Sequence, residues 1–476
     1  MHFPAGFSRT GGRLNFRFAV LTSRTDRLMA LLLVLAFALA GWKILERPPA
    51  TSFASVPQQS ATPARSARGD SLKATPVTNL PHQLSPDGRF RFDAQFVSSS
   101  PGQAVHAPSI VELRNGNLRA VWFSGSREGA GDVTIQSAVM DAKSLRWSDE
   151  STLFDRRRIQ QGLWRYVKKL GNPVIARAPD GSLWLWLVNV SLGGWAGSSI
   201  TWARSDDEGA TWSAPRRLVT SPFLNISTLV KGAPMSLQDG GVGLPVYHEF
   251  VTKFGEILRI QGDGQVLDKI RIAGSQTSLQ PVVLVGGPLQ AQVYMRSGNA
   301  NAVMSSTTDD AGKTWSIARP STWPNPDSAL AGVVTTTGAQ WLALNPKPRN
   351  RETLALLRTS IGGNFDDARP WVVESSATPE TRLSTADYER LLGNEIKASG
   401  VSAEQAQAYV ASAKRQLCGA ASCAQEFSYP YLLESRDGYI HLVYTWHRTR
   451  IKHVRFDAWQ PVSTAQAVPT HAAGPN

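Results

Sequence analysis

A phenol, an imidazole and a carboxylate follow one another directly after an apolar run, Val242–Val246, that is typical of a buried strand. They belong to Tyr247, His248 and Glu249. Glu249 could act as a base beside a nucleophile, and a Tyr–His pair could remove a proton from a carbon next to a carboxylate. The same cluster could instead be a hydrogen-bond network that only supports a site, so both interpretations stay open.

A glycine-rich loop, Ser126–Asp132, holds a second pair of chemically useful groups, Arg127 and Asp132. A planar guanidinium can bind a carboxylate through two parallel hydrogen bonds, so Arg127 could contact a ligand. It could also form an ion pair with Glu128 or Asp132 inside the loop. Asp132 could be an acid catalyst or a residue that only shapes the turn.

The elements that must position these residues are short strands. From Phe90 onward, apolar runs come in pairs joined by polar turns such as Asn-Gly, Asp-Gly and Gly-Gly, which is the hairpin signal. The pairs are Ser109–Leu113 with Leu118–Phe123, Val174–Arg177 with Leu183–Val188, Met235–Leu237 with Gly243–Tyr247, Val282–Val285 with Ala291–Arg296, Ala331–Thr335 with Gln340–Asn345, and Tyr431–Glu434 with Ile440–Tyr444. Evenly spaced hairpins predict an all-β propeller, which closes on itself and so protects its sheet edges.

One motif occurs twice with the same spacing. Ser205–Trp212 and Thr308–Trp315 share the form Ser/Thr-x-Asp-x-Gly-x-Thr-Trp. Asp207 and Asp310 can accept backbone N–H groups of a tight turn, so we expect both to be structural. Weaker copies lie at Asp141–Trp147 and Asp366–Trp371.

This motif matches the Asp-box of the sialidase superfamily, whose members are six-bladed β-propellers, and the chain resembles its bacterial BNR-repeat branch. The resemblance runs from about Phe90 to Trp459, apart from one insertion. Further segments carry it in order: His106-Ala-Pro-Ser-Ile-Val-Glu-Leu, Trp122–Asp132, Gly171-Asn-Pro-Val, Leu244–Glu249, Asn325-Pro-Asp-Ser, Glu426–Tyr431 and Ile440–His453. It implies a six-bladed propeller over residues 87–460.

The resemblance also implies a chemistry. A retaining sialidase uses arginines to hold the substrate carboxylate, a carboxylic acid to protonate the leaving oxygen, and a tyrosine nucleophile beside a glutamate. It places Asp132 at the acid, Tyr429 at the nucleophile and Arg296 at a clamp arginine, and Glu249 is our candidate for the base. Tyr429 could also be a core tyrosine beside the central channel.

Several residues near the matched segments are candidates for substrate binding: His106, Arg127, Tyr247, His248, Gln280, Arg296, Asn325, Asp327, Tyr431 and Arg448. Tyr431 follows Tyr429 by two positions, so both should point to the same side of a strand. A third cation could come from Arg351 or Arg358.

Two positions depart from the family pattern. The first blade of a sialidase opens with Arg-Ile-Pro, but here the segment is His106-Ala-Pro, so a permanent cation is replaced by a group that titrates near pH 6.5. The residues before Gln280 are Thr277-Ser-Leu, without the family's glutamate. These departures make a sugar other than sialic acid equally credible.

The insertion Thr378–Gln425 does not follow the strand pattern. Thr385 opens one predicted helix, and Ser402 opens a second with a capping-box spacing. The two helices could cover the site, bind a partner or be a structural addition at the rim. Cys418 and Cys423 are the chain's two cysteines, and they predict a short disulfide after export or free thiols otherwise. Neither a metal site nor a cofactor is expected.

The N-terminus reads as an export signal or membrane anchor. Residues Leu28–Trp42 are apolar, and five arginines precede them, which favours a cytoplasmic N-terminus. We expect a basic segment at 1–27, an anchor or signal peptide at 28–45, a flexible linker at 46–86 and a disordered tail at 461–476. The propeller would then be periplasmic, held at the inner membrane, or secreted if the signal is cleaved.

The charge distribution argues against a nucleic-acid partner. The formal net charge is +13, but residues 1–85 contain ten basic and three acidic residues, so +7 of it lies there and +6 is spread over the rest. The expected partner is a glycan, with the membrane contacted through the N-terminal helix.

The sequence supports three functions. The first is an exported, exo-acting sialidase-like glycoside hydrolase that removes a terminal acidic sugar. The second is a non-catalytic carbohydrate-binding propeller, and the third is a polysaccharide lyase that would use Tyr247 and His248.

Overall fold

The computed structural model describes residues 23–45, 50–54, 82–85, 88, 91–97, 100–221, 225–299, 301–376 and 382–457. Two compact units result, Met1–Pro49 and Ala50–Asn476. In the first, α1 (Arg24–Leu45) is long and apolar enough over Arg24–Trp42 to cross a membrane. The expected basic segment, apart from its last residues, and the expected C-terminal tail lie outside the described residues.

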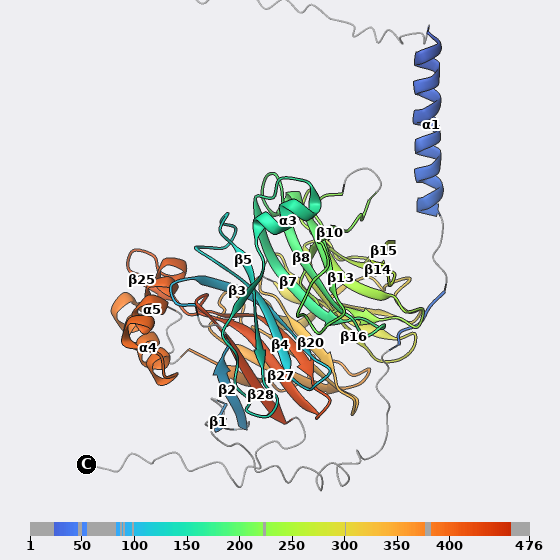
Figure 1. Cartoon of the computed structure of the whole chain (residues 1–476). Helices are drawn as coiled ribbons and strands as arrows, with labels where there is room; N and C mark the ends of the chain where they lie inside the picture. Colours follow the sequence, from blue (N-terminus) through green and yellow to red (C-terminus); the bar gives the residue numbers. More distant parts are fainter. Residues whose placement is uncertain are drawn as a thin grey trace, which may run out of the picture. The chain divides into compact units, whose positions relative to one another are not determined.

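The second unit is a six-bladed β-propeller, as the hairpin count predicts (Figure 1). The first three blades follow one another along the chain. Their strands are β3 (Ala104–Glu112), β4 (Leu118–Gly125), β5 (Thr134–Met140) and β6 (Ser151–Phe154); β7 (Lys169–Arg177), β8 (Leu183–Val190), β9 (Ser198–Ser205) and β10 (Arg216–Arg217); then β11 (Leu229–Val230), β12 (Met235–Ser236), β13 (Val242–His248), β14 (Phe254–Ile260) and β15 (Val266–Arg271).

The last three blades complete the ring. Their strands are β16 (Ser278–Val285), β17 (Ala291–Ser297), β18 (Ala302–Thr308) and β19 (Arg319–Pro324); β20 (Ala331–Val334), β21 (Ala339–Leu344), β22 (Leu354–Ser360) and β23 (Trp371–Glu374); and β26 (Phe427–Glu434), β27 (Tyr439–Trp446) and β28 (Arg450–Asp457). Each predicted hairpin is the inner pair of strands of one blade.

N-terminal strands complete the last blade. β2 (Arg91–Phe96) pairs antiparallel with β28, and β1 (His82–Leu84) pairs with β2. The ring is thus closed by hydrogen bonds between the two ends of the propeller sequence, and the sheet begins at His82, inside the expected linker.

A second part of the expected linker is also packed. Phe53 is 1% exposed, its N–H donates to the Pro288 carbonyl (2.8 Å), and it forms a β-bridge with Leu237. Trp315 and Met235 belong to the same apolar cluster. Residues 50–54 therefore form an ordered contact with the third and fourth blades.

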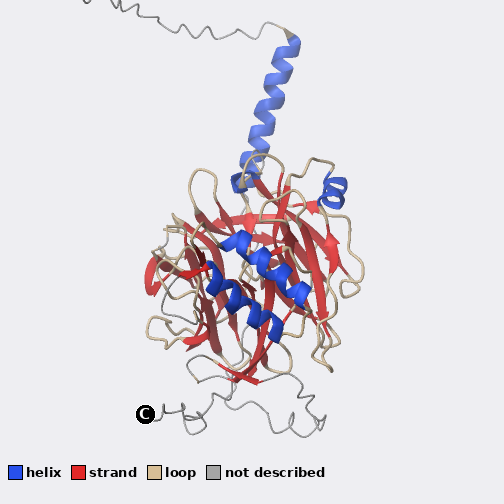
Figure 2. Ribbon diagram, turned by 90° about the vertical axis from the view of Figure 1, so that its left-hand side faces the viewer, coloured by secondary structure: helices blue, strands red, loops and turns tan. Residues whose placement is uncertain are grey.

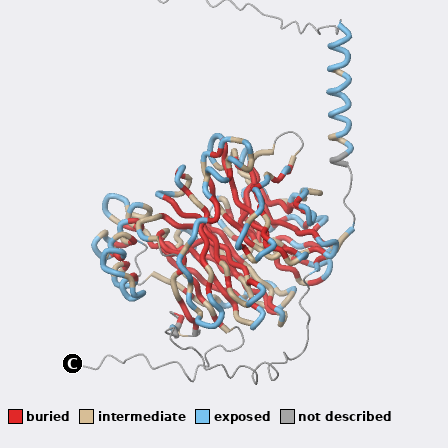
Figure 3. The backbone as a smooth tube through the Cα atoms, viewed as in Figure 1, coloured by how far each residue is buried: buried red, intermediate tan, exposed pale blue. Residues whose placement is uncertain are grey.

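The antiparallel strands give the propeller two rims. We call the "turn rim" the side with the turns between first and second strands, at 113–117, 178–182, 237–241, 286–290, 335–338 and 435–438. The "site rim" is the opposite side, with the loops between second and third strands and the connections between blades. Residues 50–54 lie on the turn rim. Burial follows the ring, with buried inner strands and exposed turns (Figure 3).

The aspartates of the repeated motif stabilise their turns by hydrogen bonds, as expected. Asp207 accepts the Thr211 N–H (2.8 Å) and hydroxyl (2.5 Å), and Asp310 makes the same contacts to Thr314 (2.9 and 2.6 Å). These hydrogen bonds, the Thr211 hydroxyl first, lower the pKa of Asp207 to about 2.

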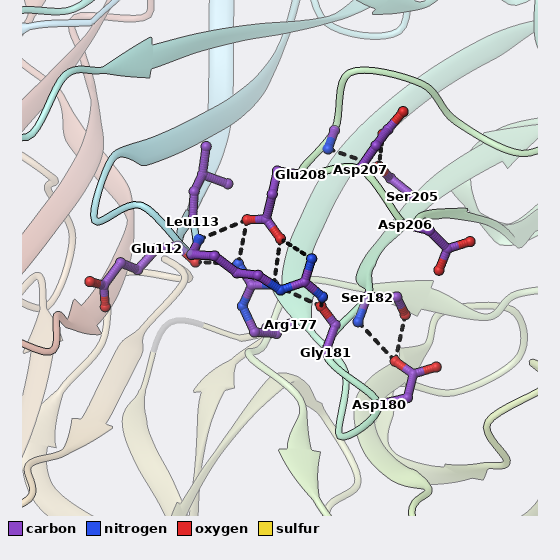
Figure 4. A network of polar contacts seen from close by, with 12 residues as sticks. Glu112, Leu113, Arg177, Asp180, Gly181, Ser182, Ser205, Asp206, Asp207 and Glu208 are labelled. Carbon is purple, nitrogen blue, oxygen red and sulfur yellow. Dashed lines mark hydrogen bonds and ion pairs between the residues drawn. The ribbon is translucent and has the colours of Figure 1, made fainter.

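Beside Asp207, Glu208 joins two blades on the turn rim. Its carboxylate accepts two bonds from Arg177 (2.7 and 3.0 Å) and one from the Arg114 N–H (2.8 Å), as Figure 4 shows for the Arg177 contacts. The first turn of the repeated motif is therefore a link between the first and second blades.

The insertion forms the two predicted helices, α4 (Thr385–Ala398) and α5 (Ala403–Leu417), at the connection into the last blade. Ser384 caps the first, and Ser402 makes a complete capping box with Gln405. The helices lie side by side (Figure 2), and a two-stranded antiparallel sheet of β24 (Arg382–Ser384) and β25 (Ser422–Ala424) joins the two ends of the insertion. Cys418 and Cys423 form a disulfide at its end.

Candidate active site

The site is built on a bulge that recurs in the first strand of four blades. Ala107, Asn172, Gln280 and Tyr429 all have positive φ, from 42° to 54°, and each precedes a proline at a register shift. Proline cannot donate to a sheet ladder, and a bulge turns a side chain out of the normal alternation. Non-glycine residues in this region carry about 1–3 kcal/mol of strain each, so the ring must hold them in place.

Tyr429 is at the centre of the resulting contacts. Its hydroxyl oxygen accepts hydrogen bonds from Nη1 of Arg296 (3.0 Å) and Nε2 of Gln280 (3.4 Å), while Gln280 Oε1 accepts from Arg296 (3.0 Å). Two N–H donors, one of them a guanidinium, converge on this phenol oxygen and fix its position. This arrangement suits a nucleophile.

A second tyrosine joins the network through the same amide. The Tyr247 hydroxyl accepts from Gln280 Nε2 (3.4 Å) and from Asn172 Nδ2 (3.1 Å). Burial, and then the charge of Glu249, raises the pKa of Tyr247 well above its ordinary value. Four blades thus contribute to one chain of polar contacts.

His248 faces away from this network. Its ring stacks on Phe254, with centroids 4.6 Å apart, because successive residues of a strand point to opposite faces. A lyase reaction would need Tyr247 and His248 on one substrate carbon, and the structure separates the two side chains.

Three arginines approach the site, each paired with an acid. Arg296 Nε donates to Asp327 (2.6 Å), Arg351 contacts Glu426 (3.3 Å), and Arg448 contacts Glu426 (3.0 Å). Burial alone would raise the pKa of Glu426, but Arg448 and then Arg351 hold it well below its ordinary value. Glu426 is therefore a carboxylate shared by two guanidinium groups.

The same arginines connect the neighbouring loops. Arg448 also contacts Glu128 (3.0 Å), and Arg351 donates to the Asp327 carbonyl (2.6 Å). Arg358, the other candidate for a third cation, lies over the Trp341 ring in the fifth blade instead.

His106 contributes a ring and no charge. It is 2% exposed, and its centroid lies 4.0 Å from that of Tyr429. Burial lowers the pKa of His106 well below its ordinary value, and Arg448 lowers it further. The position where the resemblance places an arginine therefore holds a neutral imidazole.

A lysine lies beneath Tyr429. Lys231 is 2% exposed, its Nζ donates to the Pro430 carbonyl (3.0 Å), and it lies 5.9 Å from the Tyr429 ring centroid. Burial lowers the pKa of Lys231 to about 7. Its contact with the backbone of the bulge helps to fix the orientation of Tyr429.

Glu249 has the electrostatic character of a base that can exchange a proton. Burial raises its pKa, against the opposing charges of Arg296 and Lys253. Its backbone N–H donates to the Ser227 hydroxyl (2.8 Å), which fixes the start of the loop after β13.

Asp132 and Arg127 lie in the loop after β4, on the site rim. Asp132 accepts from the backbone N–H and hydroxyl of Ser126 (3.0 Å each). The Glu128–Arg448 ion pair joins this loop to the last blade, and Gln416 of α5 donates to the Ser126 carbonyl (3.4 Å). No direct contact joins Asp132 or Arg127 to Tyr429 in the described part of the chain.

Two other expected site residues have different surroundings. Tyr431 lines a cavity of about 650 Å³ that inner strands of all six blades form and that reaches the turn rim. Asn325 is fully buried, accepts the Ser328 N–H (3.0 Å) and donates to the Ser328 carbonyl (2.9 Å), so it shapes the turn that presents Asp327.

The sequence reasoning missed Asn172, Lys231, Glu426 and Glu128 as parts of this network. One signal was present: a proline immediately precedes the apolar run of four hairpins, and the residue before that proline is the bulge residue. No comparable signal marks Lys231 or the acids, which act through partners far away in sequence. Among the described residues, no group of three or more His, Cys, Asp or Glu side chains could hold a metal ion.

Residues 116–442 match the family described as BNR repeat-like domain. No curated protein matches the chain. Among solved structures, a Hadza microbial sialidase superposes with a TM-score of 0.55 at 14% identity, over 75% of this chain and 66% of that one.

Two further structures are similar. A protein of unknown function from Dyadobacter fermentans has a TM-score of 0.55 at 10% identity, over 76% of this chain and 97% of its own. The leech intramolecular trans-sialidase, solved with 2,7-anhydro-Neu5Ac, has a TM-score of 0.51 at 12% identity, over 84% and 72% of the two chains. At these identities the likeness concerns the fold.

Proposed function

The chain belongs to the BNR repeat-like family, and from this membership and the geometry around Tyr429 we propose that it is a glycoside hydrolase that removes a terminal, acidic sugar from an extracytoplasmic glycan. The observation that carries the proposal is the Tyr429 hydroxyl, which accepts hydrogen bonds from Arg296 and Gln280 on a strained bulge at the propeller axis. Strain of this kind is concentrated at functional sites.

The proposed reaction is a retaining hydrolysis. Glu249 takes the phenol proton, the Tyr429 oxygen bonds to the anomeric carbon, and the bond from that carbon to the leaving oxygen breaks. Asp132 protonates the leaving oxygen. It then deprotonates a water whose oxygen bonds to the anomeric carbon, while the bond from that carbon to Tyr429 breaks and Glu249 returns the proton to the phenol oxygen. A tyrosine suits this role because, before it loses its proton, it carries no charge that would repel an anionic sugar.

The arginines supply the recognition. Arg296, Arg351 and Arg448 would bind the substrate carboxylate in place of part of their present contacts with Asp327 and Glu426. Because those acids neutralise the guanidinium groups, we expect weaker recognition of the carboxylate than three unpaired arginines would give.

The test is hydrolysis of a panel of aryl glycosides of acidic and neutral sugars. Tyr429→Phe and Asp132→Asn should each lower kcat at least about 100-fold on the active substrate, the usual scale for losing a nucleophile or a general acid. Tyr439→Phe and Asp149→Asn, on the turn rim, are the matched controls and should retain activity. A slowly hydrolysed fluoro-sugar should add one sugar mass to the peptide with Tyr429.

The alternative is a carbohydrate-binding propeller without catalysis. It is favoured by the hydrogen bonds of the Tyr429 hydroxyl, whose partners in the described part of the chain are Arg296 and Gln280 and include no carboxylate. Binding of an acidic sugar without turnover of any glycoside, unchanged in Tyr429→Phe, would support this function and contradict hydrolysis.

We further propose that α1 is a signal anchor or signal peptide that exports the propeller, to the periplasm in the anchored form. One apolar N-terminal helix supports this. In the anchored form, the full chain should fractionate with membranes after alkaline extraction, and a chain that begins at Ala50 should not. A cleaved signal peptide would instead leave the propeller in the soluble fraction.

A further inference from the structure

The connection between the first and second blades is strongly basic. α3 (Arg156–Leu163) and the segment after it contain six cations and no acid over residues 156–169. Arg158 donates to the Leu153 carbonyl (2.9 Å), and Lys169 lies over the Trp195 ring (3.9 Å). The other four cations have no ion-pair partner among the described residues: Arg156, Arg157, Arg165 and Lys168.

Exposed apolar side chains accompany these cations. Trp164 is 95% exposed, Tyr166 is 59% exposed, and Leu192 in the neighbouring loop after β8 is 78% exposed. A tryptophan is among the costliest side chains to leave in water, and exposed aromatic side chains beside cations suit a ligand-binding surface.

The turn that carries Trp164 is ordered. Trp164 ends α3 in the left-handed conformation (φ 50°), and its N–H donates to the Gln160 carbonyl. The Gln160 side chain accepts the Val167 N–H (3.0 Å), and Ile159 is buried below. The ring is therefore presented outward by a fixed turn.

This basic segment is continuous with the proposed site. A Cβ added to Gly131, next to Asp132, would lie 2.8 Å from Nη1 of Arg156. Trp195 contacts Gly171, next to Asn172, at a similar distance from an added Cβ. The basic segment thus begins beside the loop of the proposed acid, on the site rim.

We propose that residues 156–169, with Leu192 and Trp195, bind the remaining part of an acidic polysaccharide whose terminal sugar occupies the site. The proposal rests on the proposed function and defines its substrate as a polyanionic glycan. Guanidinium groups would bind the repeated anionic groups, and Trp164 and Tyr166 would stack on sugar faces.

One observation favours a glycan over a lipid surface. The basic segment adjoins the loop of the proposed acid, where a glycan chain whose terminal sugar occupies the site must continue.

The test measures binding apart from hydrolysis. The substituted protein carries Gln at all four unpaired cations, Arg156, Arg157, Arg165 and Lys168. The matched control makes the same change of charge on the turn-rim side, with Gln at Lys143, Arg146, Lys313 and Arg319. The probes are hyaluronan and polygalacturonate as polyanions, dextran as a neutral polymer, and phosphatidylglycerol vesicles.

We expect the fourfold substitution to weaken polyanion binding at least about tenfold at low salt. The affinity of the substituted protein should also fall less steeply than that of the natural protein between about 50 and 200 mM salt. Trp164→Ala should weaken the binding that remains at high salt. The control should bind like the natural protein, and dextran should bind weakly to all.

The failures of the two proposals are distinguishable. If aryl glycosides are cleaved but polyanion binding is unchanged by the fourfold substitution, this inference is overturned and the hydrolase stands. If the polyanion binds through this segment but no glycoside is cleaved, the hydrolase fails and the binding surface stands. Loss of vesicle binding in the fourfold variant, without polyanion binding by the natural protein, would overturn the inference in favour of a lipid surface.

Discussion

At the residue scale, the site combines strained backbone with buried charge. Tyr429, Gln280 and Asn172 have backbone conformations in the left-handed region. The amide groups of Gln280 and Asn172 donate hydrogen bonds to two phenol oxygens, those of Tyr429 and Tyr247. The surrounding acids and cations are nearly all paired, so the groups that can change charge near neutral pH are few. Two of them, Glu249 and Lys231, make predictions that pH titration can check.

Glu249 should set the acidic limb of the rate profile. Burial raises its pKa, so the carboxyl stays protonated to a higher pH than an ordinary glutamate, and the base form appears as pH rises through the raised value. We expect kcat/KM to increase over a limb centred above pH 4.5, and Glu249→Gln to abolish that limb with a large loss of rate. An unchanged limb in this variant would remove Glu249 from the mechanism.

Lys231 should make stability increase with pH. Its folded pKa of about 7 lies below the unfolded value near 10.4, so between these values the unfolded chain binds more protons, and stability rises with a slope of at most about 1.4 kcal/mol per pH unit. The measurement is urea unfolding from pH 7 to 9. Lys231→Met should flatten the curve, and an identical slope in both proteins would contradict the assignment.

At the element scale, the recurring proline bulges and the loops give the two rims different roles. The bulges direct side chains toward the site, while the turns on the other rim hold the blades together. The helices α4 and α5 belong to the site rim, because Gln416 and Ser412 of α5 donate to Ser126 and Gln103 at the first blade.

A substitution at Glu208 tests whether the two rims have separate roles. Its ion pair with Arg177 is partly exposed, so Glu208→Gln should lower the free energy of unfolding by only about 1 kcal/mol. Because the pair lies on the turn rim, kcat and KM should be unchanged. A loss of activity without a loss of stability would show that the rims are coupled.

At the scale of the whole molecule, both ends of the propeller sequence hold the ring. β2 closes the last blade through β28, and residues 50–54 add a second contact on the turn rim.

Phe53 should control the release of this N-terminal arm. Phe53→Ala removes a fully buried ring, a change worth about 3 kcal/mol or more in a core, so the arm should detach on the order of 100-fold more often. Limited proteolysis should then cut near residues 50–54 much faster, while the thermal midpoint of the propeller moves little. Equal cleavage rates for both proteins would mean that the arm does not depend on this contact.

The features of this protein that depend on local pattern could be predicted before its fold was known. Alternating apolar residues and Gly-containing turns are local properties, and they predicted six hairpins, the all-β ring and the two turns of the repeated Asp motif. Ser402 and its capping box predicted the start of α5 for the same reason. The resemblance added Tyr429 and Arg296, which the ring brings into contact (3.0 Å).

The charges and contacts of the site, in contrast, follow from the folded chain, in which residues distant in sequence meet. Arg296 and Tyr429 are 133 residues apart in sequence, and Lys231 and Pro430 are 199 apart, so no local pattern relates them. Burial made His106 neutral, and the approach of Arg351 and Arg448 kept Glu426 charged. These properties depend on what surrounds each group in space, which is fixed only when six blades close around one axis.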